Sequence, residues 1–205
     1  MPETLRQATS ETPATAPCRL AVIVGSSRQG RFAPTVADWF LRTARGRDDL
    51  DLDVIDLADH PLPRLGDEPT AEQAGRLAAL SPRLAAADAF VVVTPEYNHS
   101  FPGVLKDAID WHRAEWQAKP VGFVSYGGLG GGLRAVEQLR LVFAELHAVT
   151  VRDTVSFHGA WAVFGDDGEP VDPAVPNGAA KGMLDQLTWW AHALRDARTA
   201  RPYAV

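Results

Sequence analysis

The sequence predicts a doubly wound α/β domain, in which helices cover both faces of a parallel β-sheet. Two continuous apolar runs, residues 20–24 and 89–93, are each closed by turn-forming residues, as in strands that are buried on both faces. Segments with apolar residues at helical spacing follow each run, so strands and helices alternate along the chain. Ligands of such sheets bind beyond the carboxyl ends of the strands. We therefore expect a ligand site where these runs end.

The first half of the chain contains three predicted strands, at residues 19–25, 52–57 and 89–94. A helix over residues 34–45 joins the first two, because apolar side chains recur there at helical spacing. An irregular loop at residues 61–68 and a helix at 71–80 join the second and third. Pro82 is expected to interrupt this helix and start a further turn, since a proline inside a helix removes a hydrogen bond and clashes with the preceding turn.

The second half continues the alternation. The predicted elements are a helix at 102–116, a strand at 120–125, a helix at 133–146, a strand that begins at 149–151 and a helix at 179–198. Residues 153–178 are rich in Gly, Pro and Asp, which predicts a loop or a short hairpin around Asp166, Asp167 and Gly168. About five parallel strands result, joined by right-handed crossovers.

Composition limits the class of protein. With 205 residues and 46% hydrophobic content, residues 18–200 suffice for one domain, and residues 1–17, rich in Pro, Thr and Ala, are expected to form a disordered arm rather than a signal peptide. A net charge of −6 argues against nucleic acid or an anionic membrane as the main partner, and no apolar segment has the length of a membrane span. The single cysteine, Cys18, is typical of the reducing cytoplasm.

The loop after the first strand, residues 25–31, has the composition of an anion site. Gly25 lets the chain turn sharply, so the main-chain amides after it can converge on an anion. Ser26 and Ser27 add hydroxyl donors. Arg28 and Arg31 add positive charge. A triphosphate loop is excluded because no Gly-Lys-Ser/Thr follows, and the dinucleotide fingerprint is incomplete, so a monophosphate suits the loop best. An ordinary Ser/Gly turn with solvated arginines is the alternative.

Two further loops follow the third and fourth strands. Pro95 keeps Thr94 extended, so the strand stops cleanly, and the exposed amides after it can bind the carbonyl and imide edge of a flat heterocycle. Tyr97 offers an aromatic face to such a ring, unless it only caps the core at a strand-to-helix turn. Residues 125–132 contain five glycines, which permit close backbone approach to a ligand or form a flexible tight turn.

Four segments together resemble a known family. They are Gly-Ser-Ser-Arg-x-Gly-Arg at 25–31, Thr-Pro-Glu-Tyr-Asn-His-Ser at 94–100, Pro-Gly-x-Leu-Lys-x-Ala-Ile-Asp at 102–110 and Ser-Tyr-Gly-Gly at 125–128. In order and spacing they resemble the NAD(P)H-dependent FMN reductases of flavodoxin-like fold, over residues 19–198. The chain departs from that pattern at the three glycines 130–132, at Pro82 and at Trp161, which bears on the substrate and on the shape of the pocket.

The resemblance implies a flavodoxin-like sheet of strand order 2-1-3-4-5, with the first loop on the FMN phosphate and the other two bordering the isoalloxazine ring. The implied cofactor-binding residues are Gly25, Ser26, Ser27, Arg28, Arg31, Thr94, Pro95, Glu96, Tyr97, Asn98, Ser125, Tyr126, Gly127 and Gly128. NADPH or NADH would reduce the tightly bound FMN. A small acceptor (free flavin, quinone, azo compound or metal oxyanion) would then reoxidise it in a ping-pong cycle. Hydride transfer requires no protein acid or base, so no catalytic residue is predicted.

The resemblance also implies a cytoplasmic homodimer or tetramer that pairs the helices after the second loop. Two other functions stay open: a flavodoxin-type electron carrier without enzymatic activity, and a nucleotide- or phosphosugar-binding module. A carrier usually presents a strongly acidic docking rim. The modest negative charge and the arginines of the first loop therefore favour the enzyme.

A few other residues permit two interpretations. The six histidines lack paired metal-ligand spacing, and we interpret His60, His112, His147 and His192 as surface residues. His99 lies next to the predicted ring site and is either functional or a polar loop residue. Asp56 is interpreted as a turn residue rather than a ribose ligand, because the glycine fingerprint is incomplete. Trp111, Trp116 and Trp189 either mark a subunit interface or cover the domain's own sheet.

Overall fold

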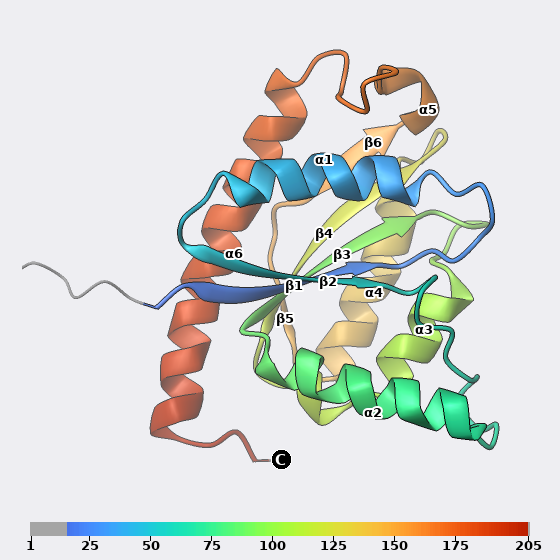
Figure 1. The fold of residues 1–205 in the computed structure, drawn as a ribbon. Coiled ribbons are helices and arrows are strands. Elements are labelled where there is room, and N and C mark those ends of the chain that lie inside the picture. Colours follow the sequence, from blue (N-terminus) through green and yellow to red (C-terminus); the bar gives the residue numbers. More distant parts are fainter. Residues whose placement is uncertain (1–15, 205) are drawn as a thin grey trace, which may run out of the picture.

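The structure, a computed structural model, describes residues 16–204 and consists of one parallel sheet between two layers of helices (Figure 1). Its strands are β1 (Cys18–Val24), β2 (Leu50–Asp56), β3 (Ala89–Pro95), β4 (Pro120–Gly127), β5 (Val149–Thr150) and β6 (Val155–His158). Most of the predicted N-terminal arm, residues 1–15, lies outside the described residues.

The strand order is β2-β1-β3-β4-β5, with β6 also paired to β4, and every pairing is parallel. The predicted order 2-1-3-4-5 is therefore confirmed. The chain passes from β1 to β2 in one direction and returns to β3 on the other side of β1. This reversal makes the β1/β3 boundary the switch point at which ligands of such sheets bind.

Helices cover both faces of the sheet, as the apolar strands require. α1 (Ala33–Arg45) and α6 (Ala174–Ala200) lie on one face (Figure 1). α2 (Ala71–Ala86), α3 (Gly103–Asp110) and α4 (Leu133–Glu145) lie on the other. Alternate residues of each central strand enter opposite cores, so that Val22 packs toward α1 and Ile23 toward α2.

The helix expected to stop before Pro82 continues through it, which corrects the prediction. α2 runs unbroken to Ala86, and Leu80 and Leu84, on either side of the proline, are both buried against the sheet. Its start is fixed by a capping box in which Thr70 accepts from the Gln73 amide and the Gln73 side chain accepts from the Thr70 amide. Tertiary burial thus outweighs the hydrogen bond that Pro82 removes.

The helix predicted over residues 102–116 is shorter than expected. α3 ends at Asp110, and a single 3₁₀ turn, η1 (Ala114–Trp116), follows. Trp116 is buried between Phe90 and Phe143, with ring centroids 4.6 and 5.5 Å away, so it covers the domain's own sheet and does not mark an interface. The indole N–H of Trp111 donates to the Pro63 carbonyl at 2.8 Å.

Residues 153–178, predicted as a loop or hairpin, contain more regular structure. β6 pairs with the end of β4, while β5 pairs with its beginning, so the two short strands act as one interrupted edge strand. α5 (Ala160–Val163) follows β6, and α6 begins at Ala174, five residues before the predicted start. The predicted turn around Gly168 is present, because Phe164 bridges Pro170 and the Gly165 amide donates to Glu169. Within residues 16–204, no helix has the length and apolarity needed to cross a membrane.

Candidate active site

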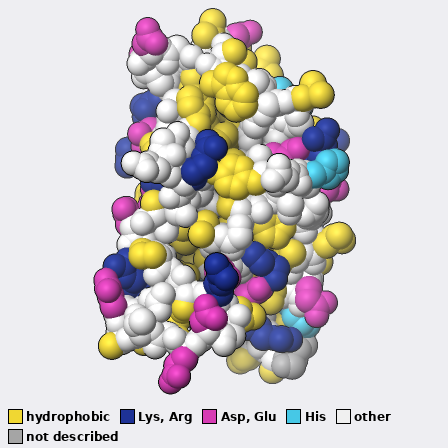
Figure 2. Space-filling view, turned by 90° about the vertical axis from the view of Figure 1, so that its right-hand side faces the viewer, with side chains coloured by type: hydrophobic (Ala, Val, Ile, Leu, Met, Phe, Trp, Pro, Cys, Tyr) yellow, Lys and Arg dark blue, Asp and Glu magenta, His cyan; other side chains and the backbone are white. Residues whose placement is uncertain are grey.

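The carboxyl ends of β1, β3 and β4 lie next to one another, and the three predicted loops meet there. The hydroxyls of Ser26 and Tyr97 are 2.9 Å apart, which joins the first loop to the second. The Glu96 amide donates to the Tyr126 carbonyl at 3.1 Å, which joins the second to the third. Figure 2 shows this side of the molecule, where hydrophobic side chains form a band through the middle and Lys or Arg side chains lie along it. Such a surface suits a ligand that is both flat and anionic.

The main-chain amides of the first loop are available to a ligand. Gly25 is held by β3, because its N–H donates to Val93, and a Cβ on it would lie 3.0 Å from Leu105. Among the described residues, the amides of Ser26 through Gly30 have no hydrogen-bond acceptor. α1 begins just beyond them at Ala33, with Pro34 in its first turn. Unpaired amides ahead of a helix N-terminus form an anion site, and the loop therefore fits a phosphate group.

The two arginines of this loop differ in their partners. Arg31 forms a two-bond ion pair with Asp56 at the end of β2, at 2.6 and 2.7 Å, and also donates to the Ser26 carbonyl. The hydrogen bond that Arg31 donates to Asp56 raises the pKa of Arg31. Arg28 has no carboxylate partner within residues 16–204, and its guanidinium lies 5.7 Å from the centre of the Tyr97 ring. The charge of Arg28 is thus more available to a ligand, while the contacts of Arg31 with Asp56 and Ser26 hold the loop in its conformation.

Asp56 is the turn residue that the sequence indicated, and it has a second role. Its carboxylate accepts from the Ala58 amide at 3.0 Å, which closes the turn after β2. The same carboxylate holds Arg31 from across the β1/β2 boundary. The second role could not be inferred from the sequence, because the two residues are 25 positions apart.

The second loop is a tight turn with few spare amides. Tyr97 and Ser100 exchange main-chain hydrogen bonds at 2.8 and 3.0 Å, and this places Asn98 and His99 at positive φ, 50° and 72°. Since the amides of Glu96 and Tyr97 are used within the protein, the main-chain donors open to a ring are those of Asn98 and His99. Thr94, at the end of β3, is fully buried and fixes the start of the turn.

The Glu96 side chain contacts α4 and the third loop. Its carboxylate pairs with Arg134 of α4 at 2.8 Å, and its side chain is only 9% exposed. A Cβ on Gly130 would lie 2.7 Å from the Glu96 carboxylate oxygens, so this carboxylate packs against the third loop. Glu96 therefore links the second loop, the third loop and α4.

The side chain of Tyr126 enters the core between the sheet and α1. Its ring packs beside Phe32, with centroids 6.2 Å apart, and burial raises the pKa of its hydroxyl. This hydroxyl is buried and has no hydrogen-bond partner among the described residues. An unpartnered buried hydroxyl beside the first loop is a further donor for an anion, and it supports the fit of a phosphate there.

The glycines of the third loop are closely packed rather than open. Gly131 and Gly132 have positive φ, 58° and 85°, and a Cβ at these positions would lie 2.6 Å from His158 and 2.5 Å from Ser125, respectively. The three consecutive glycines, a departure from the family pattern, are thus required by the packing of the chain on itself. The segment is a tight turn, in which the Gly131 amide donates to the Gly128 carbonyl at 3.3 Å.

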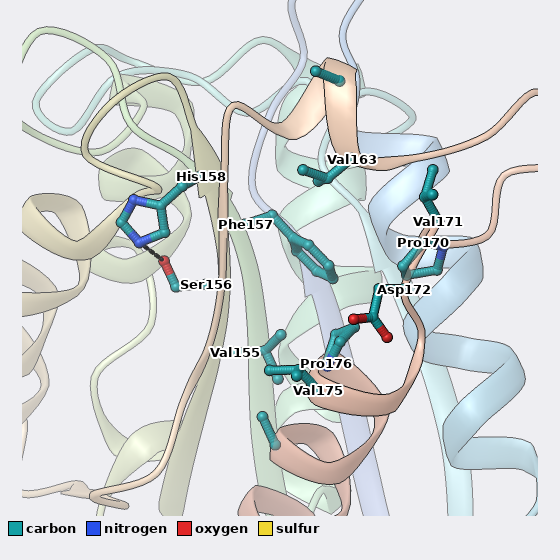
Figure 3. A pocket seen from close by; sticks show the side chains of 12 residues that line it. Val155, Ser156, Phe157, His158, Val163, Pro170, Val171, Asp172, Val175 and Pro176 are labelled. Carbon is teal, nitrogen blue, oxygen red and sulfur yellow. Dashed lines mark hydrogen bonds between the residues drawn. The ribbon is translucent and has the colours of Figure 1, made fainter.

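Three residues that the sequence analysis did not single out hold the third loop, and all lie on or next to β6. The Ser156 hydroxyl donates to the Gly131 carbonyl at 2.8 Å, the His158 ring N–H donates to Leu129 at 2.9 Å, and the Gly159 amide donates to Gly128 at 2.9 Å. Figure 3 shows His158 and Ser156 side by side on β6, joined by a hydrogen bond. The alternation Val-Ser-Phe-His at 155–158 is the period-two signal that could have found this strand.

A cavity of about 450 Å³ lies beside β6, and Ser156 and His158 are among its lining residues (Figure 3). Its walls are mostly apolar and include Val155, Phe157, Val171 and Val175. None of the predicted cofactor-binding residues lines it.

The histidines do not form a metal site. Within residues 16–204, no three His, Cys, Asp or Glu side chains are grouped so that they could hold a metal ion. His112, interpreted as a surface residue, is in fact buried, and its Nδ1–H donates to the Ala108 carbonyl at the end of α3. The early end of α3 turns this side chain inward.

Comparison with known proteins agrees with this geometry. The family model described as NADPH-dependent FMN reductase matches residues 18–162. An NAD(P)H-dependent FMN reductase of Schizosaccharomyces pombe is 40% identical over 56% of this chain, and the matched part spans 60% of that protein, about three fifths of its length. A quinone reductase of Escherichia coli K12 is 33% identical over 83% of this chain and 89% of its own.

The fold has solved counterparts. The flavoenzyme FerB of Paracoccus denitrificans, an NAD(P)H:(acceptor) oxidoreductase, superimposes with a TM-score of 0.68 and 25% identity, over 86% of this chain and 98% of its own. The predicted flavodoxin-like fold and the predicted family are both confirmed. The match over residues 18–162 and the arrangement of the three loops lead to one conclusion: this chain belongs to the NADPH-dependent FMN reductase family.

Proposed function

We propose that the chain binds FMN at the carboxyl ends of β1, β3 and β4 and uses NADPH or NADH to reduce a small acceptor. The observation that carries this proposal is the row of unpaired amides from Ser26 to Gly30, placed at the switch point of the sheet. Family membership supports the choice of FMN and of a reduced nicotinamide as its electron donor.

In this proposal the first loop binds the phosphate. The amides of Ser26 to Gly30 donate to its oxygens, and Arg28 supplies the charge that no carboxylate neutralises. Arg31 keeps the loop in shape through Asp56 and contributes charge at short range. The hydroxyls of Ser26, Ser27 and Tyr126 complete the set of donors.

The second and third loops border the ring. Thr94 and Pro95 end β3 below it, and Tyr97 and Asn98 lie along its edge. Ser125, Gly127 and Gly128 form the far side. Pairing of β4 with β6 fixes Ser125 and Gly127, and a hydrogen bond from the Gly159 amide fixes Gly128. Bound FMN would supply the two-electron chemistry, accepting hydride from the nicotinamide and passing electrons to the acceptor. The protein's contribution is to hold the ring and to exclude other reactions, so we assign no acid, base or nucleophile.

The acceptor belongs to the class of small electron-poor molecules: quinones, azo compounds, free flavin or metal oxyanions. The relatives support this class, because they include a quinone reductase of Escherichia coli and a 2-hydroxy-1,4-benzoquinone reductase of a Burkholderia species. The homodimer or tetramer and the cytoplasmic location stay predictions. Light scattering of the purified protein measures the first, and a monomeric mass at micromolar concentration would contradict it.

A stopped-flow experiment tests the function. FMN-loaded protein is mixed with NADPH, or with NADH, under nitrogen, and the visible absorbance band of the oxidised flavin should bleach within seconds. Addition of a quinone should restore the band, and the steady state should give parallel-line kinetics. If dithionite bleaches the flavin but neither nicotinamide does, the protein is an electron carrier instead.

A further inference from the structure

The outer side of the third loop carries a largely exposed indole. Trp161 is 67% exposed, although it belongs to the short helix α5 directly after β6. A Cβ added to Gly128 would lie 3.7 and 4.0 Å from Cη2 and Cζ2 of Trp161, so the six-membered ring of the indole lies against the third loop. Two thirds of this large apolar side chain nevertheless face outward, where they are free to contact a ligand.

The position of Trp161 is fixed from both sides. Before it, Gly159 adopts a left-handed conformation (φ 58°) and donates its amide to Gly128. After it, the Val163 carbonyl accepts from the Val171 amide at 3.0 Å, and Phe164 packs against Phe157 with ring centroids 4.8 Å apart. The backbone on both sides of Trp161 is therefore held, which places the indole as a wall beside Gly128.

This wall continues the edge on which the flavin ring is proposed to lie. A Cβ on Gly127 would lie 3.5 Å from the Cβ of Glu96, so the second loop contacts the third, and the third contacts Trp161. Leu129, 92% exposed, directly follows Gly128 in the chain and adds apolar surface at the same border. A molecule stacked on the exposed face of the ring therefore has an aromatic and an aliphatic side chain at one edge.

We propose that Trp161 is a specificity-determining residue that forms the outer wall of the acceptor site and favours flat aromatic acceptors over compact ions. This inference rests on the proposed function. An indole offers a large apolar and polarisable surface to a fused-ring quinone, whereas a hydrated anion gains nothing from that surface. Removal of the indole should therefore weaken the binding of a fused-ring quinone and leave the binding of a hydrated anion unchanged.

The test compares two acceptors on FMN-loaded protein. Menadione serves as the flat aromatic acceptor and ferricyanide as the compact one. Trp161→Ala should raise the KM for menadione by roughly tenfold with a small change in kcat, and leave the ferricyanide kinetics unaltered. Trp161→Phe should recover most of the loss. Trp189→Ala is the matched control, because Trp189 is 64% exposed on α6 and lies outside the three loops.

A binding measurement gives a second readout that does not depend on turnover. Calorimetric titration of the oxidised, FMN-loaded protein with anthraquinone-2-sulfonate should show a dissociation constant roughly ten times higher for Trp161→Ala than for the parent chain. Thermal melting should be nearly unchanged, since the side chain is mostly exposed.

Three results would overturn the inference. The first is an equal change in the KM for menadione and for ferricyanide in Trp161→Ala, and the second is no change in either KM. The third is a fall in the mass of Trp161→Ala measured by light scattering, which would assign the indole to a subunit contact. Failure of the parent chain to bind FMN, or to be reduced by a nicotinamide, would instead reject the proposed function. The two failures are therefore distinguishable.

Discussion

The first and third loops meet at the candidate site, but different forces hold them. The first loop is held by charge, because Arg31 is locked to Asp56 of β2 while the amides from Ser26 to Gly30 stay unpaired. The third loop is held by close packing of its glycines and by hydrogen bonds from Ser156, His158 and Gly159. Because the first loop is held mainly through one charged side chain, its main-chain amides stay available to a ligand. Because the third loop is held by contacts along its whole length, it can only present a rigid surface.

The largest expected effect is on the stability of the fold. It compares a glycine that has no space for a side chain with a glycine that only has a left-handed backbone conformation. Gly132→Ala should destabilise the protein by about 3 kcal/mol or more, because its Cβ would lie 2.5 Å from Ser125 in addition to the strain at φ 85°. Gly30→Ala is the control in the first loop, where φ is 66° but nothing lies within 4 Å. It should cost about 1–2 kcal/mol. Urea unfolding measures both, and equal losses would contradict the distinction.

The next effect concerns the charge that holds the first loop. Arg31→Ala should raise the dissociation constant of FMN by roughly ten- to a hundredfold, since a charge-assisted hydrogen bond contributes about 1.5–3 kcal/mol. Fluorescence titration of the apoprotein with FMN measures it.

Asp56→Asn shows whether Arg31 contacts the phosphate or only shapes the loop. If Arg31 meets the phosphate, loss of the competing carboxylate should leave FMN affinity equal or stronger. If Arg31 acts only through Asp56, the two variants should weaken FMN binding alike. An unchanged affinity in Arg31→Ala would assign the phosphate to Arg28 alone.

A smaller effect is expected from the supports of the third loop. His158→Ala removes the hydrogen bond to Leu129 and the contact with Ser156. The free energy of FMN binding should weaken by about 1 kcal/mol, which raises the dissociation constant roughly fivefold. The salt dependence of FMN binding should stay that of the parent chain, because the third loop contributes no arginine. His147→Ala is a suitable control, since His147 bonds to Tyr203 near the C-terminus. A loss in the control as large as in His158→Ala would show that the effect is not specific to this loop.

The smallest effect tests the link between the first two loops. Tyr97→Phe removes the hydroxyl that lies 2.9 Å from the Ser26 hydroxyl but keeps the ring beside Arg28. FMN affinity should fall by about 0.5–1 kcal/mol, a change of a few fold. Tyr97→Leu should cost more, because it also removes the aromatic face. Equal losses in the two variants would argue that the ring contributes nothing.

The parts of the fold that follow from local pattern could be predicted from the sequence. The apolar runs at 20–24 and 89–93 specify buried parallel strands, and the ligand loops follow from their ends. Pro82 and the end of α3 could not be predicted, because burial of Leu84 and Trp116 decides them and burial is a tertiary property.

The candidate site was also predictable only in part. The chemistry of its loops is visible in their residue types, but its supports come from distant segments. Asp56 and His158 reach the first and third loops from 25 and 29 positions away, across neighbouring strands. The four residues of β6 were missed because they are few and stand in a stretch dominated by Gly, Pro and Asp.

The strap between β6 and α6 has a consequence for how this chain can vary. Its two ends are fixed by pairing with β4 and by packing of α6 on the sheet. Its middle is fixed by the ring of Phe164, which packs against Phe157, and by Glu169, which pairs with Arg42, so a change in its length costs these contacts as well as loop-closure entropy. The family model itself ends at residue 162, before most of this strap. A strap grafted from a relative onto residues 164–173 must therefore keep an aromatic residue at position 164 and an acidic residue at position 169 if it is to leave β6 and α1 in place.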